Sequence, residues 1–210
     1  MSPRRRTRNP RAPRVPLSLA KGDIATWTGA LWRIHTVSGA HPAAWDGLRT
    51  RGPIEDNRWD PQPPPVGDHP GIGVSYTAPD PVTCISEVFF DDARIEVSGD
   101  RVLSGWYPAR ALNLLDPASD DWTVRHGATA SLTSAPRSGC RAWAAAMAAE
   151  LAGRIDGLVV PSTITGDPMV VFTGASDSFP PAPAFSRPLD HPDVLAVAVA
   201  ARARLGWPLG

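Results

Sequence analysis

Residues 72–90 (I-G-V-S-Y-T-A-P-D-P-V-T-C-I-S-E-V-F-F) constrain the fold most, because they predict a strand, a turn and a helix in immediate succession. Apolar residues alternate with smaller ones up to Tyr76, which is typical of a short strand. Asp80 suits the cap of a helix and Pro81 its first position. The helix would have one apolar stripe, with Glu87 pointing off it. Strand ends and helix starts often line ligand sites in α/β proteins, so this unit is a candidate site.

The rest of the chain predicts short elements joined by long loops. Its 210 residues fit one domain of ordinary size, which we place at 21–210. The 24 prolines and 18 glycines favour many turns. The run P-Q-P-P-P-V-G-D-H-P-G at 61–71 predicts a surface insertion within a loop region at 38–71, and 174–190 predicts a second Pro/Ser loop.

Hydrophobic patterning predicts further strands and two helices. Residues 23–37 alternate as in one or two strands. Other predicted strands lie at 94–98, 101–107, 110–115, 158–163 and 169–172, the last two as partners, and the predicted helices lie at 141–155 and 192–205.

The first 20 residues predict a disordered arm that is rich in arginine and proline. The positive charges of its first 16 residues are Arg4, Arg5, Arg6, Arg8, Arg11 and Arg14. Such an arm could contact nucleic acid or an acidic partner. The remaining residues are 15 basic against 21 acidic, an excess of acid that argues against a dedicated nucleic-acid binder.

Cytoplasmic localisation is the simplest expectation. No apolar run approaches the roughly 20 residues that span a bilayer. The opening M-S-P-R-R-R-T-R-N-P lacks the apolar core of a signal peptide. The two cysteines, Cys84 and Cys140, form neither a metal-binding spacing nor a disulfide framework.

Several common chemistries lack their sequence signatures. Gly71 and Gly73 precede their strand, whereas a Rossmann site needs glycines after it, and Lys21, the only lysine, lies in no P-loop. The five histidines show no paired ligand spacing, so we expect no metal. The Ser/Thr-rich stretch at 128–136 lacks a G-x-S-x-G nucleophile elbow.

The residues that remain as candidates for chemistry are Arg33, Arg58, Tyr76, Glu87 and Ser162. Each also has a purely structural interpretation. The arginines could face solvent or stack on a tryptophan, the tyrosine could be a core residue, the glutamate could be solvated and the serine could shape a turn.

In their order along the chain, these residues resemble the RES domain family, named for its Arg, Glu and Ser. The matching segments are N-R-W-D (57–60), S-Y-T-A (75–78), S-E-V-F (86–89) and D-G-L-V-V-P-S (156–162). The resemblance covers roughly residues 30–175. Two departures stand out: Asn57 replaces a usual glycine, and Asp60 replaces a usual asparagine, placing an extra acid where it could repel a phosphate.

The resemblance implies an α+β, mixed-sheet fold like that of ADP-ribosyltransferases, with long loops. It also implies a toxin of a toxin–antitoxin pair that splits the nicotinamide–ribose bond of NAD⁺. The acceptor would be water or inorganic phosphate, and NAD⁺ would be a substrate rather than a cofactor. The partner would be a small helix-turn-helix antitoxin, with no membrane and no direct nucleic-acid contact.

The same resemblance suggests a role for each candidate residue. Glu87 would stabilise an oxocarbenium-like transition state. Arg33 and Arg58 would bind phosphate oxygens. Tyr76 would stack on nicotinamide or bond the ribose, and Ser162 would bond ribose or phosphate.

Two alternatives stay open. The first is an ADP-ribosyltransferase that modifies a macromolecule; such enzymes often carry an E-x-E pair, which is absent around Glu87 and Glu96. The second is a degenerate domain retained for binding, supported only by Asn57, Asp60 and the 61–71 insertion.

Overall fold

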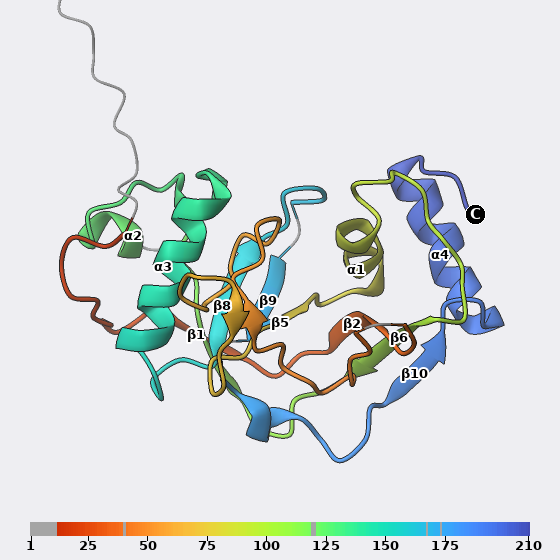
Figure 1. The fold of residues 1–210 in the computed structure, drawn as a ribbon, viewed down its shortest axis with the longest axis horizontal. Coiled ribbons are helices and arrows are strands. Elements are labelled where there is room, and N and C mark those ends of the chain that lie inside the picture. Colours follow the sequence, from red (N-terminus) through yellow and green to blue (C-terminus); the bar gives the residue numbers. More distant parts are fainter. Residues whose placement is uncertain (1–11, 40, 119–120, 167, 173) are drawn as a thin grey trace, which may run out of the picture.

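The computed structural model describes residues 12–210 except 40, 119–120, 167 and 173 (Figure 1). Its strands are β1 (Ile24–Trp27), β2 (Leu31–Thr36), β3 (Arg51–Gly52), β4 (Gly67–Asp68), β5 (Ser75–Thr77), β6 (Arg101–Trp106), β7 (Leu112–Leu115), β8 (Gly157–Pro161), β9 (Pro168–Phe172) and β10 (Phe185–Pro188). Its helices are α1 (Pro81–Val88), α2 (Trp122–Arg125), α3 (Arg137–Glu150) and α4 (Pro192–Leu205), with 3₁₀ turns η1 (Leu132–Ser134) and η2 (Ser176–Ser178).

Two sheets form the body of the molecule. The larger has the order β1-β7-β8-β9-β5, and only its β7–β8 pair is parallel. The smaller, β10-β6-β2, is antiparallel. The predicted pairing of residues 158–163 with 169–172 is confirmed by β8 and β9. A sheet that mixes both pairings, together with separate helices, is the predicted α+β architecture.

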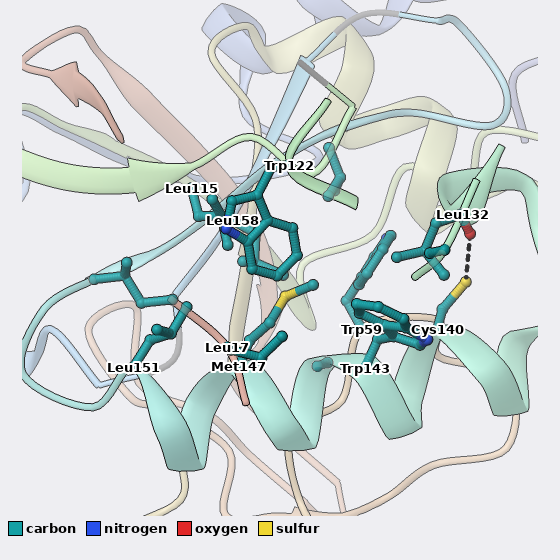
Figure 2. Close-up of a cluster of buried hydrophobic side chains, with 14 of the residues drawn as sticks. Leu17, Trp59, Leu115, Trp122, Leu132, Cys140, Trp143, Met147, Leu151 and Leu158 are labelled. Atoms are coloured by element: carbon teal, nitrogen blue, oxygen red, sulfur yellow. Dashed lines mark hydrogen bonds between the residues drawn. The ribbon is translucent and has the colours of Figure 1, made fainter. Parts of the chain in front are cut away.

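The helix α3 closes the core of the larger sheet. Its Trp143 and Met147 are buried together with Leu158 of β8 and Trp122 of α2 (Figure 2). The Sγ–H of Cys140 donates a hydrogen bond to the carbonyl of Leu132, so this thiol contributes to the packing of the core. Large buried aromatics dominate this cluster because each removes much apolar surface from water.

The helices α1 and α4 pack beside each other over the smaller sheet (Figure 1). Ile85 of α1 and Phe89, the C-cap of that helix, are buried with Leu103 of β6 and Val194 of α4. α4 begins and ends at the residues predicted for the helix at 192–205, so that prediction is confirmed. Across the described residues, no helix is both long enough and apolar enough to cross a bilayer.

The strand–turn–helix unit forms as the sequence predicts. Asp80 caps α1 by accepting the N–H of Thr83 at 2.9 Å, and Pro81 begins the helix. Just before the cap, Ala78 exchanges two main-chain hydrogen bonds with Trp32 of β2, of 2.7 and 2.9 Å. This bridge connects the edge of the smaller sheet to the end of β5.

One strand prediction and one loop prediction are wrong, for tertiary reasons. Residues 94–98 form no strand; Ile95 instead makes a parallel bridge with Leu209 near the chain end. Residues 185–188, predicted as loop, form β10 against β6. Their sequence, F-S-R-P, has no strand-like alternation, so pairing with β6 decides their conformation.

The predicted disordered arm at 1–20 extends too far. Residues 1–11 lie outside the described part, but Leu17 is only 7% exposed and packs in the α3 core. Its N–H donates to the carboxylate of Glu150 at 2.7 Å, and Ser18 bonds His126. Val15, Leu17 and Leu19 alternate with Pro16 and Ser18, but this pattern is too short to predict burial beside an arginine-rich stretch. The burial of Leu17 therefore depends on the tertiary fold.

We predict that Leu17→Ala lowers the free energy of unfolding by about 3 kcal/mol, because it leaves a cavity in the core. Urea denaturation followed by fluorescence measures this change. Val15→Ala, at a side chain that is 47% exposed, is the matched control and should change stability by less than ~0.5 kcal/mol. Equal effects of the two changes would show that Leu17 does not anchor this segment.

Candidate active site

A cavity of about 800 Å³ lies where β2, β5, α1 and the 41–54 loop meet. This volume is within the range of small-molecule sites. Among the described residues that line it, the arginines are Arg33, Arg49 and Arg51, and the only carboxylate is Glu87. The cavity is therefore suited to an anionic ligand and presents one acid to it.

Glu87 lies near the end of α1, half-buried and facing the cavity. Ser162, which follows β8, donates its hydroxyl hydrogen to a carboxylate oxygen of Glu87. The same Ser162 oxygen accepts the N–H groups of Ile164 and Thr165, each at 3.1 Å, which fixes its orientation. Burial raises the pKa of Glu87, while the Ser162 bond and the charge of Arg58 lower it. The structure thus brings together two candidates that are 75 positions apart in the sequence.

Arg33 lines the cavity and also bonds the backbone of the loop that forms its wall. Its Nη1 donates to the carbonyls of Ala44, Trp45 and Gly47 at 3.3, 3.3 and 2.6 Å. Burial, followed by the charge of Arg49, lowers the pKa of Arg33 to about 10, so the guanidinium stays charged at neutral pH. One end of this group is therefore committed to shaping the 44–47 loop.

Tyr76 contributes to the cavity wall, while its hydroxyl is turned into the protein. The hydroxyl donates to Asp60 at 2.9 Å and accepts the N–H of Trp59 at 3.0 Å. Burial and the neighbouring Asp60 charge raise the pKa of Tyr76 well above its usual value. This geometry favours a stacking role over proton transfer.

Arg58 lies close enough to lower the pKa of Glu87, although it is not among the residues that line the cavity. Its Nη1 donates to the carbonyl of Ala135 and contacts Cys140 Sγ at 3.6 Å. Arg141 of α3 fixes the preceding turn by donating to the carbonyl of Asn57 at 3.0 Å. Arg58 is therefore positioned by α3, beside the site.

Both departures in the N-R-W-D segment have structural explanations. Asp60 is fully buried and paired with Arg49 at 2.6 Å, so its charge is compensated rather than directed at a ligand. The expectation that it repels a phosphate is thus not supported by its geometry. Asn57 is not among the residues with positive φ, so its φ angle does not require glycine.

Sequence reasoning missed Arg49, Arg51 and His41 as cavity residues. They lie in a region without periodicity, and no motif indicates which side of a loop faces inward. Only an unusual density of arginine at 49–51 gave a signal.

Comparisons with known proteins show which family and which solved structure this chain resembles. The family model described as the RES domain matches residues 30–194. A chain in the crystal structure of the M. tuberculosis MbcT-MbcA toxin-antitoxin complex is 19% identical, with a TM-score of 0.54; the match covers 86% of this chain and 92% of that one. No curated protein matches. At this identity the likeness concerns the fold, and it confirms the predicted fold class.

We predict that the pKa of Glu87 lies above the ~4.3 of an ordinary glutamate and that Ser162→Ala raises it further, because a bond to the ionised form is lost. Carbon NMR titration can measure this, since the chain has only four glutamates: Glu55, Glu87, Glu96 and Glu150. Ser178→Ala, which removes a buried hydroxyl bonded to Ala175 outside the cavity, is the control. A Glu87 pKa unchanged by Ser162→Ala would contradict the assigned contact.

Proposed function

The chain belongs to the RES domain family, and on this premise we propose that it cleaves the nicotinamide–ribose bond of NAD⁺. The observation that supports this most is Glu87, the half-buried and only carboxylate among the described residues that line the cavity, whose lining also includes Arg33, Arg49 and Arg51. An ionised acid in a partly desolvated site is suited to stabilise a developing cation.

In the proposed reaction, the bond between the ribose anomeric carbon and the nicotinamide nitrogen breaks, and its electron pair neutralises the pyridinium. Nicotinamide needs no proton to leave. The ribose acquires oxocarbenium character, which the Glu87 carboxylate stabilises. Water or inorganic phosphate then adds to the anomeric carbon and loses a proton, giving ADP-ribose or its 1″-phosphate.

The remaining candidates either bind the substrate or keep the carboxylate of Glu87 ionised. Arg33 presents charge to the phosphates of NAD⁺, and the ring of Tyr76 supplies a face for stacking. Ser162 holds Glu87, and Arg58 favours its ionised form, so both help to keep the carboxylate charged. Since burial raises the pKa of Glu87, activity should fall on acidification at a higher pH than an ordinary glutamate would dictate.

We further propose that the protein acts in the cytoplasm as the toxin of a toxin–antitoxin pair. The structural neighbour is part of a toxin-antitoxin complex, which supports this choice. The proposed antitoxin is a small helix-turn-helix protein that blocks the cavity. Modification of a macromolecule remains an alternative outcome, distinguished by its products.

We predict that Glu87→Gln lowers the rate of NAD⁺ loss by at least about 10² while leaving the thermal unfolding curve close to that of the parent. Glu96→Gln, at an exposed glutamate outside the cavity, is the matched control and should retain the parent rate. Mass spectrometry with and without inorganic phosphate identifies the products. NAD⁺ consumption by Glu87→Gln at the parent rate would refute the role of this carboxylate.

A second prediction concerns cells. Expression of the parent chain in a bacterium should lower cellular NAD⁺ and arrest growth, whereas Glu87→Gln should do neither at equal protein level. Enzymatic NAD⁺ assays and growth curves measure both effects. Normal NAD⁺ and growth at confirmed expression of the parent would instead support a degenerate binding domain.

A further inference from the structure

Asp60 is a buried charge beside the cavity whose oxygens are occupied by hydrogen bonds. It is 0% exposed and accepts three donors: Arg49 Nη2 at 2.6 Å, the Tyr76 hydroxyl at 2.9 Å and the Ile54 N–H at 2.7 Å. A buried carboxylate is stable only when its oxygens are occupied in this way. One side chain therefore fixes a guanidinium and an aromatic ring in the same cavity wall.

The backbone of Arg49 is held by hydrogen bonds, whereas only part of its guanidinium has partners. Its main chain exchanges hydrogen bonds of 2.9 and 3.0 Å with Val74. A guanidinium has five N–H donors. In Arg49, contacts to Asp60 and to the Arg51 carbonyl occupy two of these donors among the described residues, which leaves three of the five. Its side chain is 30% exposed and lines the cavity.

We propose that Arg49 is a specificity-determining residue that binds phosphate oxygens of the substrate, and that Asp60 is its positioning residue. Asp60 turns the fork toward the cavity beside the Tyr76 ring. A ligand that carries a phosphate and a flat ring close together, as a nucleotide does, matches this pair of groups. The inference rests on the proposed function, because it assigns the binding of the same substrate.

The pair could have a structural role alone, and one double variant separates the two roles. Arg49→Gln leaves the Asp60 charge buried without its partner, so it should lower the melting temperature. Adding Asp60→Asn removes that charge and should recover most of the loss. If Arg49 binds phosphate, the double variant keeps the binding defect although its stability returns.

The readouts are the KM for NAD⁺ and the calorimetric Kd for ADP-ribose. Loss of a charge-assisted hydrogen bond corresponds to a change of about tenfold or more. We expect Arg49→Gln/Asp60→Asn to raise both constants by about that factor, with kcat changed by less than about threefold. Arg49→Lys, which keeps the charge but loses the fork, should fold and show a smaller rise in KM.

The matched control is Arg125→Gln/Asp23→Asn. This pair also joins a partly exposed arginine to a buried aspartate, with side-chain exposures of 39% and 2%, and lies outside the cavity. It should leave KM and Kd unchanged.

Wild-type NAD⁺ cleavage combined with unchanged KM and Kd in both Arg49 variants would overturn the inference and leave the proposed function standing. Conversely, wild-type protein that binds ADP-ribose through Arg49 without consuming NAD⁺ would support the inference and refute the proposed function.

Discussion

The two main-chain hydrogen bonds between Trp32 and Ala78 are the contact on which the site depends. They join the edge of the smaller sheet to the end of β5. Arg33 is the next residue on one side of the bridge, and Tyr76 lies two residues before Ala78 on the other. The helix that carries Glu87 starts three residues after Ala78. Because the bridge consists of backbone alone, side-chain substitutions in the wall can change the ligand site without separating the sheets.

The carboxylates around this junction differ in the partners that they have. Asp60 and Asp23 are buried, and each is paired with an arginine, so each contributes mainly to structure. Glu87 instead has a serine hydroxyl as its close partner, with an arginine charge acting on it from nearby. A carboxylate that is half-buried, has a raised pKa and faces a cavity is typical of functional positions. The contrast between carboxylates that form an ion pair with an arginine and one that is bonded to a serine is what distinguishes Glu87 in the structure.

Local chemistry determines which parts of this arrangement the sequence predicts. The Asp80 cap, Pro81 and the apolar stripe of α1 are short-range signals, so α1 and the placement of Glu87 were predictable. β10 was not, since F-S-R-P becomes a strand only by pairing with β6. The Arg49–Asp60 pair was hidden for the same reason: a loop fold brings it together, and no periodicity reports such a fold. Motif resemblance identified Ser162, but only the structure gives its contact with Glu87.

The Pro-rich insertion at 61–71 shows that a longer loop can leave the geometry of a neighbouring site unchanged. Gln62 is buried and donates to the carbonyls of Arg49 and Ile72, at 3.0 and 2.8 Å, which closes the base of the loop. β4, within the insertion, pairs with β3, and residues 63–66 of the insertion are exposed. The entropic cost of a longer closed loop grows only logarithmically with its length. The distance between Asp60 and Tyr76 is therefore set by their own hydrogen bond, and the insertion can lengthen the chain between them without displacing either group.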